Sequence, residues 1–114
     1  MTRIYKITTR AAWAEAERSG AFTGAAIDLK DGYIHLSTAL QAAETARLHF
    51  KGQQGLILVG FEAESFGEQL RWEPSRGGQL FPHVYGVLPT DAAVCVLEAS
   101  LGPDGVPVVP ALEP

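Results

Sequence analysis

An almost unbroken apolar run is the feature that most constrains how this chain can fold. It reads Leu56-Ile-Leu-Val-Gly-Phe61 and is bounded by Gly55 and Glu62. A run of this length between such residues predicts a buried central strand. In residues 3–8, which are rich in β-forming side chains, Ile4 and Lys6 alternate with Tyr5 and Ile7, so this segment predicts a strand. Residues 94–101 are again largely apolar and predict another.

Two helices are predicted between these strands. Thr8 or Thr9 can cap the first helix, and Gly20 can end it in the left-handed conformation. Trp13 falls on the apolar face of this helix and is predicted to anchor the core.

The second helix is predicted to begin after Ser37 or Thr38 and to end before Gly52. Thr38 and Gln41 have the spacing of a capping box, which is typical of a helix start. Residues 39–50 then give a broad apolar face, as expected for a helix that packs on a core.

The remaining segments read as loops and turns. Residues 20–32 contain glycines around Asp28 and Asp31, which predicts a surface loop long enough to act as a lid before a short strand at residues 33–36. Residues 102–105 read Gly-Pro-Asp-Gly, a strong turn signal, so the chain is predicted to end in a hairpin with Pro107 at an edge.

This element order predicts one domain over residues 1–114. Two main helices and several short strands without regular βαβ alternation indicate an α+β fold with a mainly antiparallel sheet. The 114 residues, 46% hydrophobic and 19% charged, suit a single globular domain that folds without metal or disulfide.

Charge and cysteine content narrow the partners and the compartment. A formal net charge of -4 provides no basic surface for a nucleic-acid backbone, so a nucleic-acid partner is not expected. Cys95 is the single cysteine and lies in an apolar run, which predicts a buried, inert thiol. We find neither a signal peptide nor an apolar run of membrane-spanning length, and therefore expect a cytoplasmic protein.

The first candidate site segment is Asp31-Gly-Tyr-Ile-His-Leu-Ser-Thr38. His35 alternates with Ile34 and Leu36, so it should face a cleft if its two neighbours face the core. Ser37 shares that face, next to the free N–H groups of the predicted helix. The alternatives are a structural histidine and a serine that only caps the helix.

The second candidate segment, residues 70–86, is rich in glycine and proline. Arg71 and Arg76 flank Trp72-Glu73, and Gly77 and Gly78 follow. Guanidinium groups bind phosphate or carboxylate through two parallel hydrogen bonds, and glycines let backbone N–H groups approach the same anion. The alternative is two solvated loop arginines, one of them paired with Glu73.

His83 and Tyr85 lie on one face of the extended segment that follows. An imidazole that titrates near neutrality beside a phenol could serve as a general acid or base next to a stacking wall. A histidine bonded to its own loop is the other reading. His49, near the end of the second helix, is explained by the helix dipole, and the histidines and Cys95 show no spacing of metal ligands.

Taken together, these segments resemble one known family. The carrying motifs are Ile4-Tyr-Lys-Ile7, Asp31 to Thr38, Thr45-Ala-x-x-His-Phe50 and Leu70-Arg-Trp-Glu...Ser-Arg-Gly-Gly...Phe-Pro-His-Val-Tyr-Gly86. From about residue 3 to residue 110 the chain is similar to the domain-of-unknown-function 952 family of small bacterial proteins, which has no established activity. The resemblance implies a fold like that of ADP-ribosyltransferases, a split antiparallel sheet that binds NAD.

That larger superfamily also implies roles for particular residues. There a His or Arg on an early strand contacts the NAD ribose and the nicotinamide amide, and His35 resembles it. An aromatic stacks on nicotinamide, a role open to Tyr33, Trp72 or Tyr85.

In that superfamily a late glutamate assists attack at the ribose, and this glutamate has no clear counterpart in the present sequence. The matching region offers His83, and Glu73 or Glu98 only if the alignment is stretched. A histidine at that place is more similar to the RNA 2'-phosphotransferase branch, although this acidic chain lacks the basic surface that a tRNA substrate favours.

We therefore expect a cleft between the two segments that binds NAD, ADP-ribose or a related phosphorylated nucleoside, without a metal. His35 would hold ribose hydroxyls, and His83 would be the general acid or base. Arg71 and Arg76 would bind the pyrophosphate, and Tyr85 or Trp72 would stack on the planar base. Any chemistry is expected at the anomeric carbon of the ribose. The alternatives are a non-catalytic module that binds a small anion and a protein-interaction domain with a Trp- and Arg-rich surface.

Overall fold

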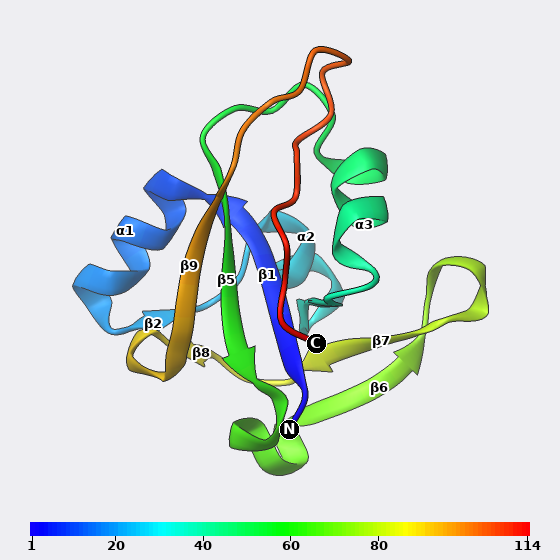
Figure 1. The fold of residues 1–114 in the computed structure, drawn as a ribbon. Helices are drawn as coiled ribbons and strands as arrows, with labels where there is room; N and C mark the ends of the chain where they lie inside the picture. Colours follow the sequence, from blue (N-terminus) through cyan, green and yellow to red (C-terminus); the bar gives the residue numbers. More distant parts are fainter.

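The computed structural model describes residues 1–114, except for the side chain of Arg76. Its larger sheet has the order β4-β1-β5-β9 and is antiparallel throughout (Figure 1). β1 (Arg3–Thr9) and β5 (Leu56–Glu62) lie in the middle, between β4 (Ser37–Thr38) and β9 (Ala93–Ala99). The predicted central strand at residues 56–61 is confirmed, as is the mainly antiparallel α+β architecture.

A second, three-stranded sheet has the order β3-β7-β6 and is also antiparallel. It consists of β3 (Ile34–His35), β7 (Leu80–Val84) and β6 (Leu70–Pro74). The chain crosses between the sheets at residues 34–38, because β3 pairs with β7 whereas β4 pairs with β1. The strand predicted at residues 33–36 is thus limited to β3, and the strand that follows it, β4, belongs to the larger sheet.

Short elements complete the fold. β2 (Ala21–Phe22) pairs with β8 (Leu88–Pro89), and three 3-10 helices are η1 (Ala63–Gln69), η2 (Arg76–Gly78) and η3 (Thr90–Ala92). No helix in the described part of the chain is long and apolar enough to cross a membrane.

The first helix, α1 (Arg10–Ser19), forms as predicted. Thr9 Oγ1 accepts a hydrogen bond from the Ala12 N–H at 3.0 Å, and Gly20 ends the helix with φ 91°. Trp13 is buried and packs edge-on against Phe61, with 6.2 Å between ring centroids, so its predicted place in the core is confirmed.

The second main helix, α3 (Ala42–His49), begins later than predicted. Thr38 and Gln41 do bond to each other's backbone N–H, as their spacing suggested, but Thr38 is a strand residue paired with Ile4. Strand pairing holds Ser37 and Thr38 extended, so the helix starts only after the turn that follows. Ser37 is therefore not a helix cap.

The prediction of a surface loop at residues 20–32 is wrong, because this segment contains β2 and a helix, α2 (Ala26–Asp31). Its length and glycines hid a helix that is fixed by the buried Asp28 rather than by an apolar face. At the other end of the chain, the predicted turn forms, with Gly105 N–H bonded to the Gly102 carbonyl at 3.0 Å. A single bridge between Leu101 and Pro107 takes the place of the expected hairpin strand.

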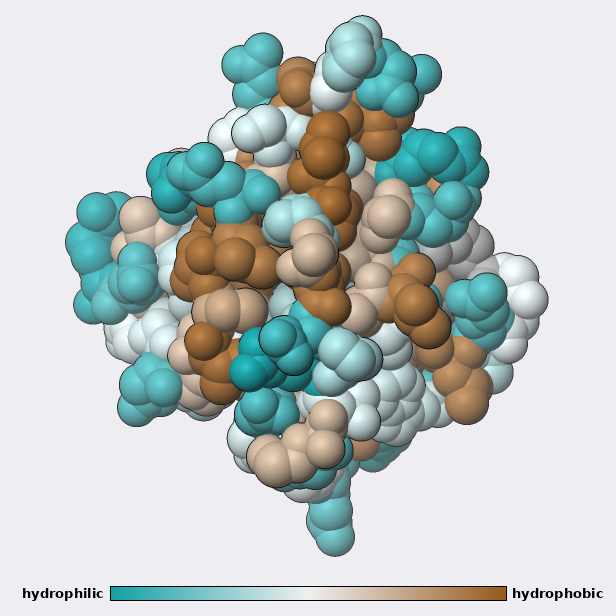
Figure 2. All heavy atoms as spheres, viewed as in Figure 1, coloured by the Kyte–Doolittle hydropathy of each residue, from teal (hydrophilic) through white to brown (hydrophobic). Residues whose placement is uncertain are grey.

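Apolar side chains cover both faces of the larger sheet. One cluster joins Trp13 to Ile57, Val59 and Phe61, and the other joins Tyr5 to α3 and to the C-terminal segment. Figure 2 shows apolar residues along the centre of one face, over β9 and the C-terminal segment. Cys95, predicted to be buried, is only half-buried, because β9 is an edge strand.

Candidate functional site

A cavity of about 610 Å³ lies between β1 and the three-stranded sheet, with α3 and the start of α2 at its sides. Its wall includes side chains from both sheets, among them Lys6, His35, Ser37 and His83. The point where residues 34–38 pass from one sheet to the other therefore borders the cavity.

His35 and His83 form a directly opposed pair on the neighbouring strands β3 and β7. Their ring centroids are 5.4 Å apart, with the planes nearly perpendicular. Ile34 and Leu36 are buried in the core, so His35 takes the opposite face, as the alternation predicted. His83 is itself buried and borders the cavity.

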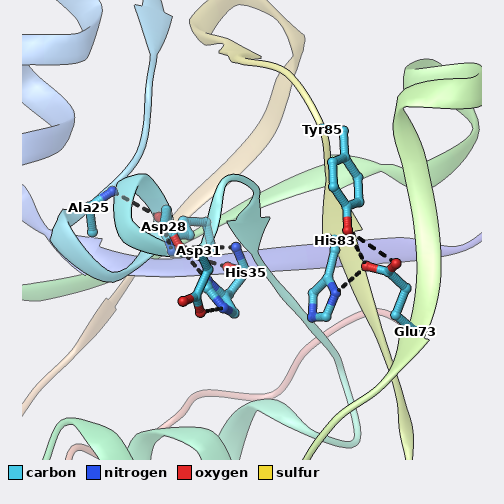
Figure 3. A network of polar contacts seen from close by, with 8 residues as sticks. Ala25, Asp28, Asp31, His35, Glu73, His83 and Tyr85 are labelled. Atoms are coloured by element: carbon cyan, nitrogen blue, oxygen red, sulfur yellow. Dashed lines mark hydrogen bonds and ion pairs between the residues drawn. The ribbon is translucent and has the colours of Figure 1, made fainter.

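Carboxylates contact both ring nitrogens of His35 (Figure 3). The Asp28 Oδ1 atom is 2.6 Å from Nδ1, and the Asp31 Oδ2 atom is 3.0 Å from Nε2. An ionised carboxylate can only accept hydrogen bonds, so this arrangement suits a ring that donates from both nitrogens. The Asp28 side chain in the first contact is buried, whereas Asp31 in the second is exposed.

Asp28 is also half of a buried ion pair. Lys6 Nζ lies 2.8 Å from Asp28 Oδ2 and also donates to the His35 carbonyl at 3.0 Å. Burial opposes the ionisation of Asp28, but the charge of Lys6 and hydrogen bonds from Lys6 and His35 hold the Asp28 pKa below its ordinary value. Asp28 therefore remains a carboxylate at neutral pH and keeps a proton on His35 Nδ1.

A second carboxylate orients His83. Glu73 Oε1 lies 2.8 Å from His83 Nδ1 and accepts a hydrogen bond from the Tyr85 hydroxyl, also at 2.8 Å (Figure 3). Hydrogen bonds from His83 and then Tyr85 lower the pKa of Glu73, and the bond to Glu73 raises the pKa of Tyr85. No contact of the described residues occupies His83 Nε2, so in the neutral ring this nitrogen is a free acceptor.

Tyr33 covers both histidines. Its ring centroid lies 4.2 Å from that of His83, 4.7 Å from His35 and 5.2 Å from Tyr85. Burial, followed by the charges of Asp31 and Glu73, raises the pKa of Tyr33, so its hydroxyl stays protonated at neutral pH.

The structure brings together only part of the predicted site. His35, Ser37 and His83 border the cavity, and Ser37 Oγ is 3.0 Å from Thr45 Oγ1. Arg71 lies opposite His83, but its guanidinium sits 4.5 Å from the centre of the Tyr85 ring.

Other predicted residues are not brought to the cavity. Trp72 pairs with Pro82 on the opposite face of the sheet and borders a separate shallow hollow. The side chain of Arg76 lies outside the part of the chain that the structure describes.

The sequence reasoning missed the carboxylates and the lysine behind His35. The strand pattern places Lys6 on the same inward face as Ile4, and a lysine at such a position is itself a signal of a buried partner. Asp28 gave no comparable signal, because its burial depends on the helix α2 that the glycines concealed. Among the described residues, no group of three His, Cys, Asp or Glu side chains is placed to hold a metal ion.

Comparisons with known proteins show the family and the overall fold of this chain. A family model with the description "Protein of unknown function (DUF952)" matches residues 7–96. The crystal structure of protein CC0527 from Caulobacter crescentus is 50% identical, with a TM-score of 0.91 and 93% of each chain covered. The solution NMR structure of CC0527 has a TM-score of 0.84 at 50% identity, covering 94% of this chain and 92% of that one. No curated protein matches the chain.

Proposed function

This chain belongs to the family of proteins of unknown function called DUF952, and we propose that its cavity binds NAD, ADP-ribose or a related nucleotide through the ribose. The observation that carries the proposal is the opposed pair His35 and His83, each fixed by a carboxylate at the cavity wall. Two oriented imidazoles beside a cavity are an arrangement suited to proton transfer and to binding hydroxyl groups.

The size and lining of the cavity support a nucleoside-like ligand. About 610 Å³ is within the range of small-molecule sites. Leu36, Phe50 and Phe81 offer apolar surface for a planar base, whereas the hydroxyl and amide side chains of Ser37 and Gln53 can bond to sugar hydroxyls. A ligand with a flat ring and a polyol fits this mixture of walls.

In the proposed complex, His35 binds a ribose hydroxyl. The contact of its Nε2 with Asp31 is the more exposed of its two carboxylate contacts, so a ligand hydroxyl can take its place. Asp28 meanwhile keeps the ring oriented through Nδ1. This division leaves one ring nitrogen for structure and one for the ligand.

His83 is proposed as the general base at the anomeric carbon. Its Nε2 takes a proton from an attacking water while the bond between the anomeric carbon and the leaving base breaks, and the base departs with the bonding electron pair. When that base is the cationic nicotinamide of NAD, it leaves neutral, and the water oxygen ends on the ribose. The nearby carboxylates Asp31 and Glu73 favour the oxocarbenium-like charge that develops.

The meeting of two antiparallel sheets around the cavity is compatible with the ADP-ribosyltransferase-like fold that the sequence resemblance implies. Glu73, in contact with His83, is also a better candidate for the late carboxylate than Glu98, which pairs with Arg10 in an exposed ion pair. Arg71, paired with His83 across the strands, remains the proposed phosphate contact, for which it would leave the face of Tyr85.

A second candidate function is binding without turnover. The observation that favours it is the occupation of both His35 nitrogens by carboxylates, which leaves His83 as the one cavity histidine of the pair with a free nitrogen. In that case the protein senses a ribosyl metabolite and His83 only donates or accepts a hydrogen bond.

A ligand panel measured by thermal unfolding and calorimetry tests the binding proposal. At about 100 times its dissociation constant, a ligand adds about 2.7 kcal/mol, enough to raise the midpoint of a domain of this size by roughly 10 °C. We expect this with NAD or ADP-ribose, and we expect its loss in His35→Ala. The matched control Trp72→Ala alters an aromatic outside the cavity and should keep the shift. No shift with any nucleotide would contradict the proposal.

A further inference from the structure

Helix α2 has no apolar anchor. Asp28, 2% exposed, is its sole buried residue, whereas Ile27 and Leu29 are 51% and 68% exposed. Most surface helices are held by an apolar stripe packed on the core. Carboxylates attach this helix instead: the buried Asp28, and the exposed Asp31, whose Oδ2 atom lies 3.0 Å from Nε2 of His35.

The Asp28 carboxylate joins three parts of the molecule. Oδ2 accepts from Lys6 Nζ of β1 and from the Ala25 N–H, both at 2.8 Å, while Oδ1 accepts from the N–H and the ring Nδ1 of His35 at 3.0 and 2.6 Å. The same group therefore fixes the start of α2, its position over β1 and the ring of His35.

Glycines lie on both sides of α2. Gly24 and Gly32 have φ values of 124° and 86°, backbone conformations that glycine adopts without steric cost. Ala25 and Ile27 border the cavity, so any displacement of α2 opens its wall.

From these contacts we propose that α2 is a lid over the cavity and that Asp28 is both its latch and a positioning residue for His35. When α2 lifts about its glycine flanks, Asp28 leaves Lys6 and His35 together, and the imidazole loses the acceptor that orients it. His35 is consequently aligned only when the cavity is closed. Closure thus assembles the site, as lids do in many enzymes; this functional meaning rests on the proposed ribosyl site.

Amide hydrogen exchange without any ligand tests the lid, so its outcome is independent of whether a nucleotide binds. Two helix-end amides form a matched pair, because Gly32 N–H bonds to the Asp28 carbonyl and Gly20 N–H bonds to the Ala16 carbonyl, both at 2.8 Å. We expect Gly32 to exchange at least ~10-fold faster than Gly20, and with a weaker denaturant dependence than amides of β5. Equal denaturant dependence for Gly32 and β5 would overturn the lid, and this test needs no variant.

Asp28→Asn should raise the exchange of Gly32 by at least a further ~10-fold and leave Gly20 unchanged. Asp31→Asn is the matched control, because it removes the same charge from α2 but contacts only Nε2 of His35. The Nδ1–H resonance of His35 should vanish in Asp28→Asn and persist in Asp31→Asn. A persistent resonance in Asp28→Asn, or Gly32 exchange equal to that of the wild type, would overturn the positioning role.

Discussion

Replacing Asp28 with asparagine should lower the free energy of unfolding by about 3–5 kcal/mol, one of the largest losses expected from any single substitution in this chain. Asparagine has one carbonyl oxygen in place of two: if that oxygen keeps the bonds from Lys6 and the Ala25 N–H, its amide nitrogen, a donor, faces the N–H and Nδ1 of His35. The substitution also leaves the charge of Lys6, 4% exposed, without its partner. Urea unfolding at pH 7 measures the loss. A domain of this size has about 5–15 kcal/mol to lose, so the variant should still fold.

The double variant Lys6→Met with Asp28→Asn distinguishes the effect of an unpaired buried charge from the effect of altered side-chain packing. Removing both charges of a buried pair is often nearly neutral, whereas removing one is costly. We therefore expect the double variant to be more stable than Asp28→Asn alone. Glu15→Gln, which breaks an exposed pair with Arg18, is the control and should change little. Losses that simply add would show that the buried pair is not coupled.

The pH dependence of the unfolding free energy in acid should report on the same Lys6–Asp28 pair in the wild type. The pKa of Asp28 is lowered by folding, so its stabilisation is complete above the unfolded pKa of about 3.9 and is lost as the pH falls through the folded value. Between pH 5 and pH 2, the unfolding free energy of Asp28→Asn should consequently fall less steeply than that of the wild type. Parallel slopes would contradict the assigned direction of the shift.

The second large effect concerns chemistry at His83. If the protein cleaves NAD, His83→Gln should lower the rate of nicotinamide release by about 10²–10⁴-fold, because a general base contributes that much. Ligand affinity should change far less, since glutamine can still form a hydrogen bond at the same wall. Chromatographic detection of nicotinamide from NAD at pH 7 measures the rate.

Glu73→Gln supplies the companion variant. It should lower the rate less than His83→Gln does, and the two changes together should lower it no further than His83→Gln alone, because the residues act as a unit. Tyr85→Phe removes only the phenol contact with Glu73 and should have a small effect. Unchanged nicotinamide release in His83→Gln would remove this residue from the mechanism.

The sequence predicted those elements whose signals are local. α1 follows from its Thr9 cap, its Gly20 stop and the apolar position of Trp13, and β5 follows from its continuous apolar run. His35 could be placed opposite the core because alternation in a strand is also a local rule.

What could not be predicted depends on contacts between distant segments. Lys6 and Asp28 are far apart in the chain, and each charged side chain can be buried only because the other lies beside it. The start of α3 moved because Thr38 pairs with Ile4, a tertiary constraint that overrides a capping-box signal. Trp72 could not be placed either, since only the register with Pro82 fixes which face of the sheet it takes.

The most direct test of the central claim follows the imidazole signals of His35 and His83 by NMR while ADP-ribose is added to millimolar concentration. Binding between the paired strands predicts that both sets of signals shift with one shared dissociation constant. The indole N–H of Trp72, on the opposite face of the sheet, should stay fixed. Unmoved histidines at saturating ADP-ribose, or a shift confined to Trp72, would contradict a ribosyl site in this cavity.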